Sequence, residues 1–190
     1  GIAAVNGLDT FGLAPPDHER AMQLQQNSLG SVVVLLSHVH LDDPRTMKHL
    51  ENFFAAFEGR DDMDLSDIAV VMVGDFISKP QNLGDIAHLD DGIAERQQYL
   101  SLFDKLATLL HTKAPKVASQ CTFVFVPGPN DAAGPNGMFP QSPISHAFTE
   151  RLRRWVPHSM FAPNPCRLRF FTHEIVIARH DYLDTLRKDP

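Results

Sequence analysis

The stretch TFVFVPGPNDAAGP, residues 122–135, decides the fold class predicted for this 190-residue chain. Its four consecutive apolar residues, 123–126, stand next to turn-forming residues, which is typical of a strand buried on both faces. The turn Pro127-Gly128-Pro129 ends this strand, and the polar pair Asn130-Asp131 follows at its carboxyl end. Open α/β sheets usually bind their ligands at that end of the strands, so we expect a functional site there.

Two earlier stretches have the same design. The apolar residues 32–36 lead into His38 and His40, and the apolar residues 68–73 lead into Gly74-Asp75. We therefore predict three buried strands whose polar ends meet at one edge of a sheet. Helical patterns separate the strands, and this alternation predicts an α/β fold, a mostly parallel sheet with helices on its face.

The helices are predicted from capping residues and apolar spacing. Asp43 and Pro44 begin a helix that ends at Gly59, and its apolar stripe is expected to pack on the sheet. Asp91 is expected to cap a second helix, whose predicted apolar face is Ile93, Leu100, Phe103, Leu106 and Leu110. Further expected elements are a helix or a polar linker over 17–26, a helix from Ser142-Pro143, a hairpin over 168–177 and a helix over 182–188.

Length, composition and charge limit the possible functions. The length suits one domain or a piece of a larger one, and the formal charge of −6 argues against a protein that grips nucleic acid alone through a basic face. No apolar run approaches the roughly 18 residues that span a bilayer.

Cys121 and Cys166 lack metal or redox spacing, which favours a reducing, intracellular location. The cluster Arg151, Arg153 and Arg154 is interpreted as a solvated face, with a phosphate or partner contact as the alternative.

Three of the polar residues could form a metal site. His38 and His40 are two apart on a predicted strand, so they would point to the same side and, with Asp75, supply two imidazoles and a carboxylate. The alternative is structural, because histidines at strand ends often bond to backbone or water and an Asp after Gly often caps a turn. The sequence contains no nucleophile elbow and no glycine-rich phosphate loop.

The order of these polar residues resembles the calcineurin-like metallophosphoesterases, which carry Asp-x-His, Gly-Asp and Gly-Asn-His-Asp/Glu on successive strand ends. Here the motifs read His38-Val39-His40, Gly74-Asp75 and Gly128-Pro129-Asn130-Asp131. The ligating Asp, the ligating Asn and the assisting His are therefore lost. The resemblance implies an inactive site without catalytic residues, metal or cofactor, whose former metal positions are His38, His40, Asp75, Asn130 and Asp131. An active metal-dependent phosphoesterase, or an adventitious metal at the histidines, is the alternative.

This pattern of loss resembles the B subunits of eukaryotic replicative DNA polymerases, and within them the branch that serves DNA polymerase epsilon. The matching residues are 123–129 with Asp131, Phe139-Pro140, Pro143-Ile144, Val156-Pro157, Asn164-Pro165-Cys166-Arg167, Thr172, Glu174-Ile175-Val176, Arg179 and Asp181. The resemblance implies a calcineurin-like α/β/β/α sandwich that lacks its C-terminal part. Residues 1–27 would be an arm from a preceding OB-type domain, and residues 28–190 a partial, inactivated phosphoesterase-like domain.

The same resemblance implies a nuclear, non-catalytic scaffold in chromosomal DNA replication. Its expected partners are the C-terminal domain of the catalytic subunit of DNA polymerase epsilon and, through the full-length protein, the replicative helicase assembly. Contact with DNA is expected only indirectly, through the complex, and no membrane partner is expected. A truncated sheet is also expected to expose apolar edges.

Overall fold

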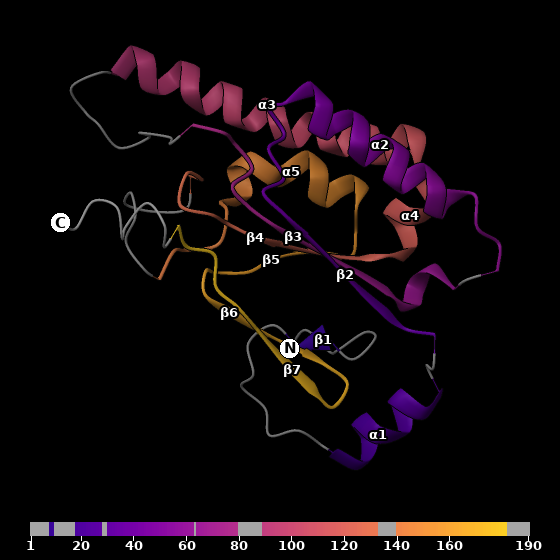
Figure 1. Cartoon of the computed structure of the whole chain (residues 1–190). Coiled ribbons are helices and arrows are strands. Elements are labelled where there is room, and N and C mark those ends of the chain that lie inside the picture. Colours follow the sequence, from indigo (N-terminus) through magenta and orange to yellow (C-terminus); the bar gives the residue numbers. More distant parts are fainter. Residues whose placement is uncertain are drawn as a thin grey trace.

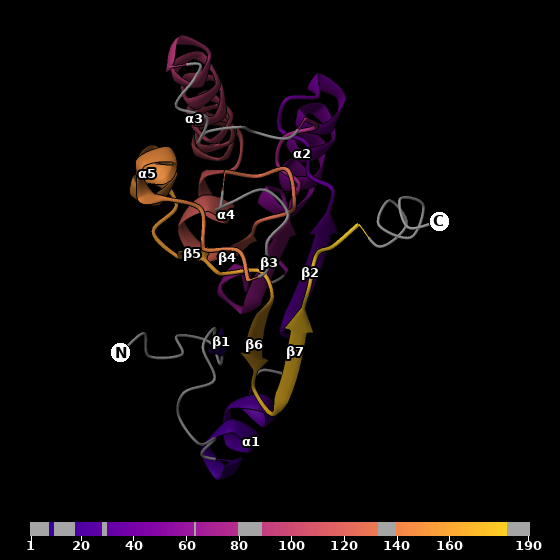
Figure 2. The same ribbon diagram turned by 90° about the vertical axis from the view of Figure 1, so that its left-hand side faces the viewer.

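The structure is a computed structural model, which describes residues 8–9, 18–27, 30–62, 64–79, 89–132 and 140–181. These residues form three layers: a layer of helices, a parallel sheet and an antiparallel sheet (Figures 1 and 2). The parallel sheet has the order β2 (Val32–Ser37), β3 (Ile68–Val73), β4 (Thr122–Val126) and β5 (Ser159–Phe161). The antiparallel sheet has the order β1 (Leu8–Asp9), β6 (Cys166–Phe170) and β7 (His173–Ile177).

The helix layer consists of α2 (Pro44–Glu58), α3 (Leu89–Lys113), α4 (Pro115–Gln120) and α5 (His146–Trp155), and it covers one face of the parallel sheet (Figure 2). A short 3-10 turn, η1 (Leu65–Asp67), precedes β3. The remaining helix, α1 (His18–Asn27), lies near the end of the β6–β7 hairpin. The observed alternation confirms the predicted α/β fold with a parallel sheet.

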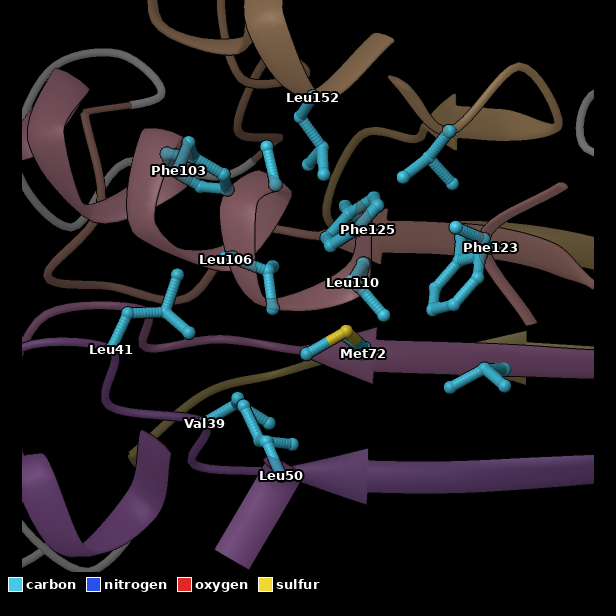
Figure 3. Close-up of a cluster of buried hydrophobic side chains, with 14 of the residues drawn as sticks. Val39, Leu41, Leu50, Met72, Phe103, Leu106, Leu110, Phe123, Phe125 and Leu152 are labelled. Atoms are coloured by element: carbon cyan, nitrogen blue, oxygen red, sulfur yellow. The ribbon is translucent and has the colours of Figure 1, made fainter. Parts of the chain in front are cut away.

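The central strands β3 and β4 are buried along their whole length, as predicted. Successive side chains of a strand point to opposite faces, so Phe123 and Phe125 of β4 join the core under the helices, and Val124 and Val126 join the core between the two sheets. Figure 3 shows Phe123 and Phe125 with Met72 of β3 and with Leu106 and Leu110 of α3. Each fully buried side chain of this size stabilises the fold by about 1.5–3 kcal/mol.

The first strand, β2, was predicted to be buried, but the structure shows that it is not. It is an edge strand that pairs only with β3 among the described residues, and Val32 and Leu35 are 39% and 57% exposed. An apolar run indicates that both faces of a strand are packed, but it does not indicate whether the strand lies at the centre or at the edge of the sheet. The expected exposed apolar edge is therefore present here, at β2.

The predicted helix after the first strand is confirmed as α2. The Asp43 side chain accepts a hydrogen bond from the Arg45 N–H at 2.8 Å, Pro44 is the first helical residue and Gly59 is the C-cap. Leu50 and Phe54 are buried in the core, and Met47, Phe53 and Phe57 pack against it. The apolar stripe therefore packs on the sheet, as its spacing predicts.

The second predicted helix differs from α3 in its start and in its buried face. Helix α3 begins at Leu89, so Asp91 lies inside the helix and is not its cap. Of the predicted apolar face, Phe103, Leu106 and Leu110 are buried, but Ile93 and Leu100 are 55% and 39% exposed. Helix α3 packs against both α2 and α5, and it also buries Tyr99, Leu102 and Ala107, of which Tyr99 contacts the Phe148 ring of α5.

The remaining elements correct or complete the predictions. Helix α5 begins at His146 with Ser145 as its N-cap, three residues beyond the predicted Pro143, and Ile144 is buried before the helix starts. The hairpin is confirmed as β6–β7, whereas α4 and β5 were not predicted. The helix predicted over 182–188 lies outside the described residues.

The described parts of the N-terminal arm contact the antiparallel sheet. Strand β1 pairs with β6, with Leu8 opposite Phe170, and the Thr172 hydroxyl lies 2.7 Å from Gln25 Oε1 of α1. Residues 18–27 are helical, so this segment is a helix and not a polar linker. The division of the chain at residue 27 stays a prediction.

Candidate functional site

The carboxyl ends of β2, β3 and β4 bring the predicted polar residues together. Asp75 follows β3 and Asn130 follows β4, and the Asn130 N–H donates to Asp75 Oδ1 at 2.8 Å. The Asn130 side chain is turned to another partner, because its Nδ2 donates to the Ser78 carbonyl at 3.4 Å. The prediction that these strand ends meet at one edge is therefore confirmed.

Asp131 is buried and accepts hydrogen bonds from three donors. The Gly128 N–H donates to its carboxylate at 2.7 Å, the Phe76 N–H at 2.9 Å and the Tyr99 hydroxyl at 3.1 Å. Burial raises the pKa of Asp131 to about 7, with the nearby charge of Asp75 adding to this and the three donors opposing it. Burial also raises the pKa of Tyr99, so this hydroxyl keeps its proton and stays a donor.

The contacts of Asp131 have a structural consequence. They join the backbone after β3, at Phe76, to the backbone after β4, at Gly128. Both carboxylate oxygens are occupied by these donors, so Asp131 offers no free oxygen to a metal or a substrate. Asp131 holds the two strand ends together.

The two histidines lie in the loop after β2, not on the strand as predicted. Strand β2 ends at Ser37, and His38 adopts a left-handed backbone conformation with φ of 55°. The ring centres of His38 and His40 are 6.0 Å apart. Nε2 of His40 is buried and has no hydrogen-bond partner within the described ranges. The strand assignment fails because the apolar run gives no sign that the chain turns at His38.

The sequence pointed to Arg179, which follows β7, only as a residue that matches the family, and it did not predict that Arg179 belongs to this edge. Its Nη2 lies 2.9 Å from Asp75 Oδ2 and 2.9 Å from His38 Nε2. The side chains of Arg179 and Asp75 are only 10% and 6% exposed, so this is a largely buried ion pair. Arg179 is 104 residues from Asp75, and no local pattern in the sequence signals the contact.

These contacts do not suit a divalent metal. Within the described part of the chain, no three His, Cys, Asp or Glu side chains are grouped so that they could hold a metal ion. The two oxygens of Asp75 already accept from Asn130 and Arg179, and the positive charge of Arg179 would repel a metal cation. The contacts of Asp75 at this edge therefore form an ion pair within a hydrogen-bond network.

The three arginines of the basic cluster have partners within the chain. Arg151 lies over the Trp155 ring at 4.4 Å, Arg153 lies over the Phe161 ring at 4.1 Å, and Arg154 pairs with Glu150 at 2.9 Å. The arginine cluster thus matches the solvated-face interpretation better than a phosphate site.

Both cysteines are buried and free. Burial raises the pKa of the Cys121 thiol to about 12 and that of the Cys166 thiol to about 11, which leaves both thiols unreactive.

A family model that describes the B subunit of DNA polymerases alpha and epsilon matches residues 33–189 of the chain. The chain belongs to this family. The DNA polymerase epsilon B subunit of Schizosaccharomyces pombe is 33% identical over 185 residues, which are 95% of this chain and 29% of that protein. The protein of the same name from Arabidopsis thaliana is 32% identical over 98% of this chain and 34% of its own length. "DNA polymerase epsilon subunit 2" of Homo sapiens is 29% identical over 86% of this chain and 28% of its own length.

These relatives confirm the resemblance that the sequence motifs predict. The chain spans only about a third of the length of the curated relatives, between 28% and 34% in the three comparisons above. Among the described residues, no helix has both the length and the apolar character that crossing a membrane requires.

Proposed function

We propose that this chain is part of a non-catalytic accessory subunit of DNA polymerase epsilon, which acts as a scaffold in chromosomal DNA replication in the nucleus. The family match over residues 33–189 carries this proposal. We further propose that residues 28–190 are a partial calcineurin-like phosphoesterase domain, an α/β/β/α sandwich whose site has degenerated. Residues 1–27 would then be the arm that enters from a preceding OB-type domain.

The contacts at the sheet edge support a degenerate site. Hydrolysis by two metal ions needs carboxylates and imidazoles with free lone pairs on both sides of the substrate phosphate. Asp75 is neutralised by Arg179, and Asp131 is saturated by three donors. Asn130 is the remaining polar side chain after β4, and its amide nitrogen is directed at the Ser78 carbonyl. None of these groups is placed to activate a water molecule.

The proposed partners are the C-terminal domain of the catalytic subunit and, through the full-length protein, the replicative helicase assembly, with DNA reached only through the complex. The buried centre of a protein–protein interface is more apolar than the rest of the surface, so exposed apolar side chains are candidates for contact with a partner. On the described surface such side chains occur on α1, β2, α3 and β7, and they include Leu35, Ile93 and Val176. We propose that at least one of these three positions lies in the interface with the catalytic subunit.

Two assays on the full chain test the proposal. Hydrolysis of a generic phosphodiester with added manganese should be absent, and the chain should co-purify with the catalytic subunit. Leu35→Asp, Ile93→Asp and Val176→Asp should each leave the fold intact, and at least one should weaken co-purification. Turnover that Asp75→Ala abolishes would refute the scaffold and establish the alternative, an active phosphoesterase. Co-purification that none of the three variants weakens would refute the proposed surfaces.

A further inference from the structure

The segment that leads into α5 contains a serine between two prolines. It reads Pro140-Gln141-Ser142-Pro143, and Ser142 is the only Ser or Thr of the chain that is directly followed by proline. Protein kinases of the proline-directed class phosphorylate serines in this setting. Their site for the residue after the serine gives a backbone N–H no partner, and proline is the residue that brings no N–H. The motif therefore indicates a phosphorylation site, provided that the fold exposes it.

The exposure of this segment matches the positions that such a kinase recognises. Pro140, Ser142 and Pro143 are exposed, whereas Gln141 and Ile144 are only 4% and 2% exposed. The preferred pattern of these kinases is a proline directly after the serine, often with another two residues before it. The recognised side chains therefore face solvent, and the two residues that the pattern leaves free are the ones that the fold buries.

The two buried residues hold the segment in place. The Gln141 N–H donates to the Asn164 carbonyl at 2.7 Å, and the Gln141 carbonyl accepts from the Asn164 N–H at 3.0 Å. The Gln141 side chain donates to the Gly128 carbonyl at 3.1 Å and accepts from Asn164 Nδ2 at 2.8 Å. Ile144 packs in the core under the helices. The segment is thus ordered before a kinase binds, which lowers the entropy cost of binding.

The backbone around Ser142 suits a kinase substrate. A residue that precedes proline is kept out of the helical region, and residues 142–145 belong to no helix or strand. Ser145, the N-cap of α5, has φ of −57° and ψ of 143°, which is close to the polyproline II conformation. Helix α5 begins only at His146, so the regular helix starts four residues beyond the serine.

We propose that Ser142 is a phosphorylation site for a proline-directed protein kinase. The Ser142 hydroxyl oxygen bonds to the γ-phosphorus of ATP, the bond between that phosphorus and the β–γ bridging oxygen breaks, and ADP leaves. The hydroxyl proton passes to the catalytic aspartate of the kinase. The phosphate adds about 1.5 to 2 negative charges at pH 7. Residues 132–149 contain no Asp or Glu, so no carboxylate of the neighbouring sequence repels it.

Phosphorylation of the full, folded chain tests this proposal. The chain is incubated with ATP and, in separate reactions, with a purified mitogen-activated protein kinase and a purified cyclin-dependent kinase, and mass spectrometry locates the phosphate. We expect at least one of these kinases to add about one phosphate per chain, on Ser142. Ser142→Ala should lose this phosphate, and so should Pro143→Ala, which keeps the hydroxyl group.

Ser119→Ala is the matched control. Ser119 is also exposed, but alanine and not proline surrounds its position in the recognised sense, since Gln120 follows it. This variant should incorporate as much phosphate as the unmodified chain. Equal incorporation by Pro143→Ala, phosphate only on residues other than Ser142, or no phosphate with either kinase would overturn the proposal.

Thermal unfolding shows whether the folded chain carries the phosphate. The phosphorylated chain should melt within about 2 °C of the unmodified chain, because changes at exposed positions have little effect on stability. A larger fall in melting temperature would mean that the segment leaves its place when modified, and this too would overturn the proposal. The kinase assay uses this chain alone, so its failure would leave the proposed scaffold function untouched.

Discussion

Gly128 lies where the segments after β3 and β4 pass close to each other, so Gly128→Ala is a direct test of how the candidate site is held. An added Cβ would stand 2.7 Å from the backbone nitrogen of Asp75 and 2.9 Å from its Cγ, and it would also contact Oδ1. Both distances are below the 3.0 Å that real Cβ contacts respect, and one of the atoms is backbone. Asp75 therefore has to move, which disturbs its hydrogen bond from Asn130 and its ion pair with Arg179.

The expected cost has two parts. Forcing a methyl group into a packed site costs about 1–3 kcal/mol. Losing a hydrogen bond to a charged carboxylate costs about 1.5–3 kcal/mol more. We therefore expect Gly128→Ala to lower the free energy of unfolding by about 2.5–6 kcal/mol, a large part of the stability of an ordinary domain.

Urea denaturation of the full chain measures this change from the shift of the midpoint at a common slope. Gly59→Ala is the matched control, because the nearest heavy atom to its added Cβ would be the Ala55 carbonyl oxygen at 3.7 Å, an ordinary contact. That variant should change the free energy of unfolding by less than about 1 kcal/mol. Equal midpoints for Gly128→Ala and Gly59→Ala would show that the approach of Gly128 to Asp75 is not as close as the structure has it.

Three further predictions concern the core, the cap and pH. Burial raises the folded-state pKa of Asp131 from 3.8 to about 7. The folded state therefore holds a proton that the unfolded state releases, so stability should fall by about 4 kcal/mol from pH 4 to pH 8, relative to Asp131→Asn. Parallel pH profiles of the two proteins would contradict this. Phe125→Ala should cost about 3–5 kcal/mol in urea denaturation, against less than about 1 kcal/mol for the exposed Leu35→Ala, and similar losses would count against the assigned core. Asp43→Ala, which removes the N-cap of α2, should cost about 1 kcal/mol, and an unchanged midpoint would argue that the cap is dispensable.

The parts of the fold that follow from short-range patterns were predictable. The runs over 68–73 and 123–126 became the two central strands because a strand covered on both faces needs apolar residues at every position. Helix α2 begins after Asp43 and ends before Gly59, since capping depends on groups a few residues apart. The meeting of Asp75 with Asn130 followed from the parallel order of neighbouring strands.

The sequence did not predict features that depend on where an element lies relative to its neighbours in the sheet or in the helix layer. Leu35 and Val71 both lie in apolar runs, but Leu35 is 57% exposed on an edge strand and Val71 is fully buried in a central one. Likewise, Ile93 matched the helical period of the buried residues of α3 yet faces solvent, because the neighbours of that helix decide which of its faces is covered.

The sequence by itself determined the α/β class, the central strands, the capped helix α2 and the family to which the chain belongs, because each of these rests on local composition or on ordered motifs. Only the tertiary structure decided what the polar strand ends do. It brought Arg179 to Asp75 across 104 residues and turned three candidate ligands into an ion pair and a hydrogen-bond network. The physical reason is that the charge state and free lone pairs of a side chain depend on its neighbours in space, which no spacing along the chain records.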